Sequence, residues 1–224
     1  MKPCLRALLI ALLLALPAQA QDGGPFGILE RRELPLERTV AFPTHTLRLT
    51  LAQIDGSGWA PESIHIALGE SAKILGQCGI ILEKTELILV RAPERYRDFH
   101  SPRSRELARA LPLEKPTVYF VAGTRQRPAF EAEAIGRGNS RTRPELADTV
   151  WVTRGTRDLG IALAHELAHI LMDSGEHSDQ PGNLMRDETA PESTRLSAAQ
   201  CAQMRETATS NGLLRYARRR DRSE

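Results

Sequence analysis

The pattern of apolar positions along the chain predicts five short strands. Residues 46–51 alternate polar and apolar side chains, which is the period of a half-buried strand. Residues 80–90 are rich in Ile, Leu and Val, and residues 117–121 and 149–153 are compact apolar runs. Residues 131–138 are ambiguous, and we assign them as an edge strand.

Apolar residues at helical spacing predict four helices. The four segments are residues 61–76, 101–111, 157–172 and 197–210. Pro61 suits the first turn of the first helix, and Ser197 and Gln200 have the spacing of a capping box at the start of the last. The order of the elements therefore predicts an α/β (α+β) domain, with helices packed on a sheet.

The first 20 residues have the features of a secretory signal peptide. Basic Lys2 and Arg6 flank the start of an apolar run over residues 5–16, and residues 18–20 form a small-x-small cleavage site. This apolar run is short against the roughly 20 residues that a membrane-spanning helix needs. We therefore expect export to the periplasm or the medium, a mature chain that starts near Gln21, and no stable membrane insertion.

The rest of the chain divides into a long central domain and two short ends. Residues 21–43 contain several Gly and Pro residues, which predict an irregular N-terminal arm or a short pro-segment. Residues 44–212 have a length that suits one domain with a sizeable core. Residues 213–224 form a basic tail, which we expect to be solvated, and the alternative is a tail that binds an anionic surface.

The net charge bears on the expected class of binding partner, and the cysteine content bears on disulfide formation after export. The signal peptide carries two of the 30 Lys and Arg residues, which leaves 28 basic residues against 28 acidic ones. A neutral chain gives no reason to expect a nucleic-acid partner. Cleavage also removes Cys4, so Cys78 and Cys201 are the remaining thiols of a chain bound for an oxidising compartment. We expect a disulfide between them, with two buried free cysteines as the alternative.

A His-Glu-x-x-His motif lies in the third predicted helix. His165 and His169 are four residues apart, so both imidazoles lie on one face of the helix and can reach one metal ion. Glu166 leans toward a water in the open position of the metal, where a general base is needed. The flanking side chains are apolar, and burying two imidazoles and a carboxylate among them is costly unless a metal or hydrogen bonds compensate.

Residues 165–185, with the sequence HELAHILMDSGEHSDQPGNLM, resemble the zinc site and methionine turn of the metzincin metallopeptidases. The resemblance implies that His165, His169 and His177 are zinc ligands, that Glu166 is the general base, and that Met185 lies beneath the site. It also implies a single metzincin-like domain. In such a domain a mixed, mostly parallel five-stranded sheet packs with the active-site helix and a C-terminal helix.

The spacing to the third ligand departs from the family pattern. In that pattern a glycine lies three residues after the second histidine, and the third ligand lies six residues after it. Here Gly175 lies six residues after His169, and His177 lies eight residues after it. The eight residues from His177 to Met185 are similar to the matrixin-like spacing. Three nearby carboxylates are the alternatives to His177, namely those of Asp173, Glu176 and Asp179.

We therefore expect an exported endopeptidase that hydrolyses peptide bonds with a zinc-activated water and Glu166 as general base. Its partner is a peptide or protein substrate, which would lie extended against the edge strand at residues 132–138. One alternative is a zinc-binding envelope protein of the same fold with latent or no peptidase activity. A second alternative is another kind of zinc hydrolase, in which a downstream glutamate, Glu188 or Glu192, is the remaining zinc ligand. The last alternative is a module that binds an anionic surface through the basic tail.

Overall fold

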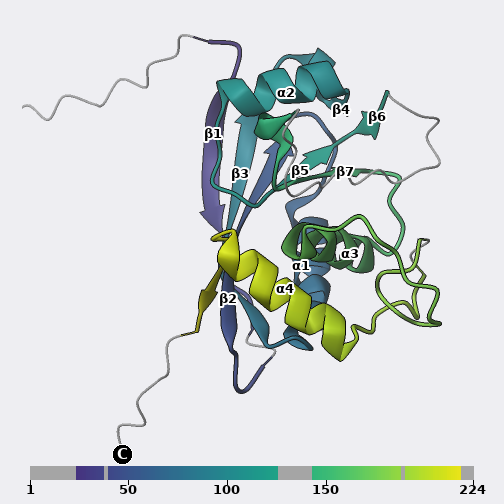
Figure 1. Ribbon diagram of the computed structural model, residues 1–224. Coiled ribbons are helices and arrows are strands. Elements are labelled where there is room, and N and C mark those ends of the chain that lie inside the picture. Colours follow the sequence, from purple (N-terminus) through teal and green to yellow (C-terminus); the bar gives the residue numbers. More distant parts are fainter. Residues whose placement is uncertain (1–23, 38–39, 126–142, 188–189, 218–224) are drawn as a thin grey trace, which may run out of the picture.

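The computed structural model describes residues 24–37, 40–125, 143–187 and 190–217 (Figure 1). Its main sheet has the strand order β1-β3-β2-β5-β7, and β8 pairs with the start of β2. The strands are β1 (Gly27–Glu33), β2 (His45–Ile54), β3 (Ile80–Arg91), β5 (Thr117–Val121), β7 (Thr149–Thr153) and β8 (Leu214–Tyr216). Strands β3, β2, β5 and β7 are parallel to one another, while β1 is antiparallel to β3 and β8 is antiparallel to β2. The mostly parallel mixed sheet that the resemblance implied is confirmed, with six strands among the described residues where five were expected.

Four helices accompany the sheet, and each lies where its apolar periodicity predicted it. They are α1 (Pro61–Gly76), α2 (Ser101–Ala110), α3 (Leu159–Met172) and α4 (Ala198–Ser210). Two short 3-10 helices, η1 (Glu94–Tyr96) and η2 (Pro144–Leu146), and a small parallel pair, β4 (Asp98–Phe99) with β6 (Gly123–Thr124), complete the described elements. The capping box is confirmed, because the Ser197 hydroxyl accepts from the Gln200 backbone N–H and the Gln200 side chain accepts from the Ser197 N–H.

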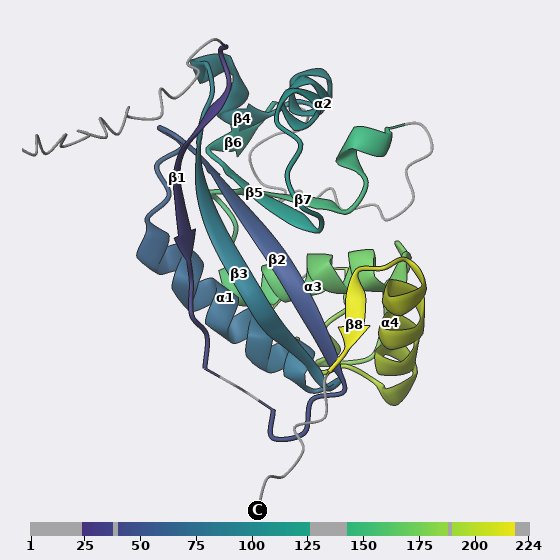
Figure 2. The same cartoon turned by 90° about the vertical axis from the view of Figure 1, so that its left-hand side faces the viewer.

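The inner strands are buried on both faces. On β5, Phe120 packs in the core shared with α1, α3 and α4, while Tyr119 lies in a second core, to which α2 contributes. Figure 2 shows α2 and α3 on opposite sides of β5 and β7. Trp151 on β7 lies in that second core and stacks on Tyr119 with ring centroids 4.0 Å apart. Two-sided burial explains why these strands read as continuous apolar runs and not as alternating ones.

Residues 27–33 correct the prediction of an irregular arm. They form β1, which is antiparallel to β3 at the edge of the sheet. Because an edge strand need not bury its side chains, its sequence is polar and carries no alternation, so the pattern did not predict it. Arg31 reaches across to Glu86 of β3 at 2.7 Å. Similarly, β8 places residues 214–216, the start of the expected basic tail, in the sheet.

Two predicted segments lie outside the described residues. They are the signal peptide at residues 1–20 and the edge strand at residues 131–138. In the part of the chain that the structure describes, no helix has both the length and the apolar character needed to cross a membrane.

Close approach of α1 fixes the position of α3. The Ser71 hydroxyl of α1 donates to the Gly160 carbonyl at 2.8 Å, and both residues are buried. A Cβ at Gly160 would lie 2.5 Å from the Cβ of Glu70, a distance that two carbon atoms cannot adopt without displacing the helices. Glycine therefore lets the first turn of α3 sit against α1.

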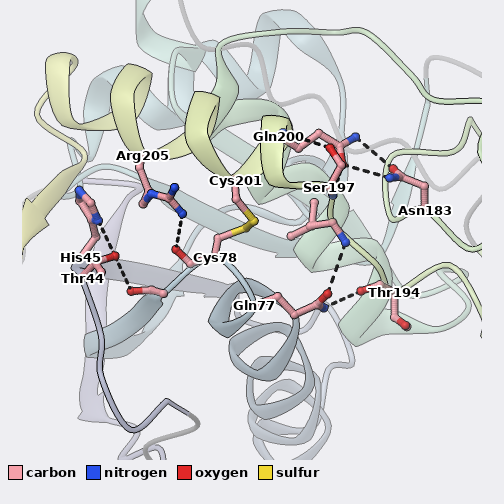
Figure 3. The surroundings of a disulfide bond; sticks show 12 residues. Thr44, His45, Gln77, Cys78, Asn183, Thr194, Ser197, Gln200, Cys201 and Arg205 are labelled. Carbon is pink, nitrogen blue, oxygen red and sulfur yellow. Dashed lines mark hydrogen bonds between the residues drawn. A yellow bond between two sulfur atoms is a disulfide. The ribbon is translucent and has the colours of Figure 1, made fainter.

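A disulfide joins Cys78, just beyond α1, to Cys201 in the first turn of α4 (Figure 3). Both cysteines are buried and belong to the core shared by the helices. The bond spans a sequence separation of 123 residues, so it removes many conformations from the unfolded chain.

Removing this disulfide is expected to lower the free energy of unfolding by about 3–5 kcal/mol. We would compare urea unfolding of the wild type with that of the Cys78→Ala/Cys201→Ala variant, each with and without a dithiol reductant. Reductant should bring the wild type to the level of the variant and leave the variant unchanged. A wild type whose stability is insensitive to complete reduction would contradict the expectation.

Candidate metal centre

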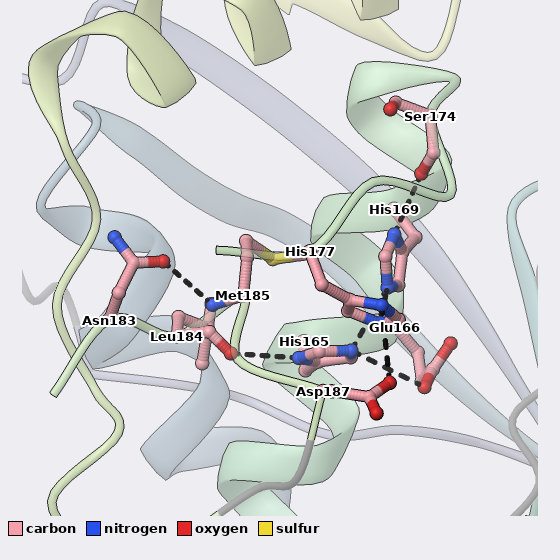
Figure 4. Close-up of polar contacts among 9 residues, drawn as sticks. All are labelled: His165, Glu166, His169, Ser174, His177, Asn183, Leu184, Met185 and Asp187. Carbon is pink, nitrogen blue, oxygen red and sulfur yellow. Dashed lines mark hydrogen bonds and ion pairs between the residues drawn. The ribbon is translucent and has the colours of Figure 1, made fainter. Parts of the chain in front are cut away.

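Three imidazoles meet at one point on the surface of α3 (Figure 4). His165 and His169 project from successive turns of α3 and are 4% and 7% exposed. Their Nε2 atoms lie 2.9 Å apart, and the Nε2 of His177 lies 3.3 Å from that of His169. One ligand atom from each of the three side chains fits within 4.8 Å, so the arrangement could hold a single metal ion.

The turn after α3 returns the chain to place His177. The helix ends at Met172, and Asp173 adopts a left-handed conformation with φ 49°. Aspartate tolerates this conformation better than most residues, so the turn is made two residues before Gly175. The Ser174 N–H then donates to the His169 carbonyl at 3.2 Å. From this turn the chain runs on to His177, eight residues after His169.

Backbone carbonyls determine which nitrogen of each buried histidine faces the centre. The Nδ1 of His165 lies 2.7 Å from the Leu184 carbonyl oxygen, and the Nδ1 of His169 lies 2.7 Å from that of Ser174. A carbonyl oxygen only accepts, so each Nδ1 carries the proton and donates. The Nε2 lone pairs of the neutral rings consequently point toward each other.

This arrangement fits a bound cation. Burial lowers the pKa of His169 to about 4 and also lowers the pKa of His165, so both rings are neutral near pH 7. Two neutral Nε2 atoms that face each other at 2.9 Å have no proton to share and repel each other. Two nitrogens bound tetrahedrally to one zinc ion at about 2.0 Å would lie about 3.3 Å apart, close to the observed spacing.

Asp187 orients the third imidazole. Its carboxylate lies 3.3 Å from the Nδ1 of His177, whose side chain is 37% exposed. A carboxylate on Nδ1 leaves Nε2 facing the centre and makes the ring a stronger donor to a metal. Asp187 was not predicted from the sequence. The signal available was an acidic residue two positions after Met185.

Glu166 lies at the centre without joining the three ligand atoms. Its carboxylate oxygen is 4.0 Å from the Nε2 of His165, and its side chain is largely buried. Burial raises the pKa of Glu166 to about 8, so this carboxyl group can both accept and release a proton near neutral pH.

The turn at residues 183–185 contacts both His165 and the loop that carries His177. Met185 is buried in the core that α1, α3 and α4 share. Its carbonyl accepts at 2.6 Å from the N–H of Ser178, the residue after His177. The Asn183 side chain accepts from the Met185 N–H at 2.9 Å. Met185 therefore connects the loop that carries His177 to the core.

The carboxylates considered as alternative third ligands are not members of the three-residue group. Those that the structure describes are Asp173, Glu176, Asp179 and Glu192. Glu188 lies outside the described residues. The geometry favours His177 over the described carboxylates.

Comparison with known proteins bears on the fold alone. No protein-family model matches the chain, and no curated protein matches its sequence. Among solved structures the chain is similar to metalloproteinase-II from Bacteroides fragilis, with a TM-score of 0.55 and 19% sequence identity. The similarity covers 77% of this chain and 55% of that one, so the chain spans little more than half the length of that protein. A mostly parallel sheet with packed helices is thus a fold found in a metalloproteinase.

Proposed function

We propose that this protein is an exported zinc-dependent endopeptidase of the metzincin type. The observation that carries the proposal is the convergence of three Nε2 atoms, from His165, His169 and His177, beside a buried carboxyl group. A centre of three imidazoles with an open fourth position is typical of catalytic zinc. The signal-like residues 1–20 and the disulfide are compatible with export.

Each residue of the centre has a separate role in this proposal. When bound, zinc would polarise the scissile carbonyl and lower the pKa of water. The three histidines would hold the ion, and their Nδ1 contacts to Leu184, Ser174 and Asp187 fix the ring orientations. Glu166 accepts a proton from the attacking water and passes it to the departing amine.

An extended peptide or protein chain is the proposed substrate. In the part of the main sheet that the structure describes, β7 is the edge strand on the side opposite β1. The segment predicted to bind substrate, residues 132–138, stays a prediction. Neither charge nor fold suggests a nucleic-acid partner.

Removing the metal is expected to abolish cleavage reversibly. Purified protein should contain one zinc per chain, cleave an unstructured protein such as casein, lose activity on treatment with a chelator, and regain it when zinc is added back. Zinc content by atomic spectroscopy and cleavage by gel would be measured on the same samples. Magnesium added back instead of zinc serves as the control, because it binds imidazole poorly.

Two outcomes would contradict this proposal in different ways. Protein that takes up no zinc even after loading would exclude the metal centre. Protein that binds one zinc but cleaves nothing would favour the alternative of a zinc-binding envelope protein with latent or no peptidase activity.

A further inference from the structure

The first two turns of α4 and the segment before it are joined to the end of α1 by several contacts (Figure 3). The disulfide joins Cys201 to Cys78, and the guanidinium of Arg205 donates to the Cys78 carbonyl at 3.0 Å. The side chain of Gln77 donates to the Thr194 carbonyl at 2.7 Å, in the segment that leads into α4. The start of α4 therefore has a defined position relative to the helix that supports α3.

Gln200, next to Cys201, forms a reciprocal amide pair with Asn183. The Asn183 amide donates to Gln200 Oε1 at 3.0 Å, and the Gln200 amide donates to Asn183 Oδ1 at 3.1 Å. Asn183 is buried, and its Oδ1 also accepts from the Met185 N–H. These contacts determine the orientation of both amides, since a flipped Asn183 would place its NH₂ group against the Met185 N–H.

The same turn ends at a histidine of the metal centre. The Met185 N–H that Asn183 accepts belongs to the same peptide group as the Leu184 carbonyl. This carbonyl accepts the Nδ1–H of His165 at 2.7 Å. On its other side the Leu184 N–H donates to the Arg195 carbonyl at 2.7 Å. A continuous series of hydrogen bonds thus runs from Gln200 through Asn183 and the Leu184 turn to His165.

We propose that Gln200 is a positioning residue for the metal ligand His165. It acts through Asn183 by holding the Leu184 carbonyl where the His165 ring requires its acceptor. This inference rests on the proposed zinc site. Contacts that orient a ligand from outside the coordination sphere typically change metal affinity by about 10–100-fold, so Gln200 is expected to affect zinc binding without touching the ion.

Two substitutions separate this role from the capping role of Gln200. Gln200→Glu keeps the capping box, because glutamate serves equally well at this position, but a carboxylate cannot donate to Asn183 Oδ1. Ser197→Ala is the matched control, since it removes the hydroxyl of the same capping box and leaves the amide pair in place. The negative charge added by glutamate would by itself favour a cation, so a loss of affinity cannot come from charge.

The test is zinc affinity, measured by competition with a chromogenic chelator, together with hydrogen exchange at the Met185 amide in zinc-free protein. Gln200→Glu should weaken zinc binding roughly tenfold and speed this exchange, whereas Ser197→Ala should leave both near wild type. Wild-type zinc affinity in Gln200→Glu, or an equal loss in both variants, would overturn the inference while the proposed function stands. A wild type that binds no zinc would overturn both.

Discussion

Replacing Glu166 with alanine is expected to slow peptide hydrolysis about 10³-fold and leave zinc bound. The carboxylate of Glu166 lies 4.0 Å from the Nε2 of His165 but is not one of the three converging ligand atoms. Its loss removes the group that accepts the proton from water, and such groups contribute about 10²–10⁴-fold to rate. We expect kcat/KM to fall by about 10³-fold, equivalent to about 4 kcal/mol of transition-state stabilisation.

The measurement pairs steady-state cleavage of a fluorogenic peptide with zinc content for each variant. Glu166→Gln should be as inactive as Glu166→Ala, because an amide keeps the shape and cannot accept the proton. The matched control is Glu206→Ala, which removes an exposed glutamate of α4 outside the three-histidine group. Substantial activity in Glu166→Gln would assign the general base to another group.

Replacing His177 with alanine is expected to weaken zinc binding by more than about 100-fold. This histidine supplies the third Nε2, 3.3 Å from that of His169, and loss of a direct ligand should exceed the effects of residues outside the coordination sphere. Asp187→Asn should have a smaller effect, about tenfold, because the His177 ring keeps a neutral partner in place of a charged one. Zinc affinity by chelator competition distinguishes the two.

His65→Ala serves as the control for histidine content. His65 lies on α1, and its ring nitrogen contacts the Pro35 carbonyl at 3.0 Å, outside the three-histidine group. The His65 variant should bind zinc like the wild type. If His177→Ala instead keeps wild-type affinity, the third ligand is a carboxylate, and Asp173→Ala, Glu176→Ala and Asp179→Ala would identify it.

The elements with clear periodicity could be predicted because they depend on local patterns. Helix α3 has apolar residues on most sides and is enclosed by α1, α4 and the sheet. Strands β5 and β7 are compact apolar runs and are buried on both faces. Strands β1 and β8 could not be predicted in this way. Their side chains are largely exposed, and only pairing with β3 and β2 makes them strands.

In the candidate site, too, features that depend on local sequence could be predicted and features that depend on tertiary contacts could not. The spacing of His165 and His169 determines by helix geometry alone that their rings share a face, so the sequence was enough to pair them. Sequence spacing did not determine the place of His177, because its distance from His169 differs from the family pattern. The left-handed turn at Asp173 and the Met185 contact to Ser178 bring it to the centre.

The sequence by itself determined the helix that carries the centre, the two histidines one turn apart and the carboxylate between them, since all depend on residues within a few positions of one another. Only the tertiary structure decided the ring orientations, the return of His177 and the support from Gln200. These depend on partners from separate segments, such as the Leu184 carbonyl 19 residues after His165 and the Asn183–Gln200 pair 17 residues apart. Hydrogen-bond geometry between distant segments exists only once the core has packed them together.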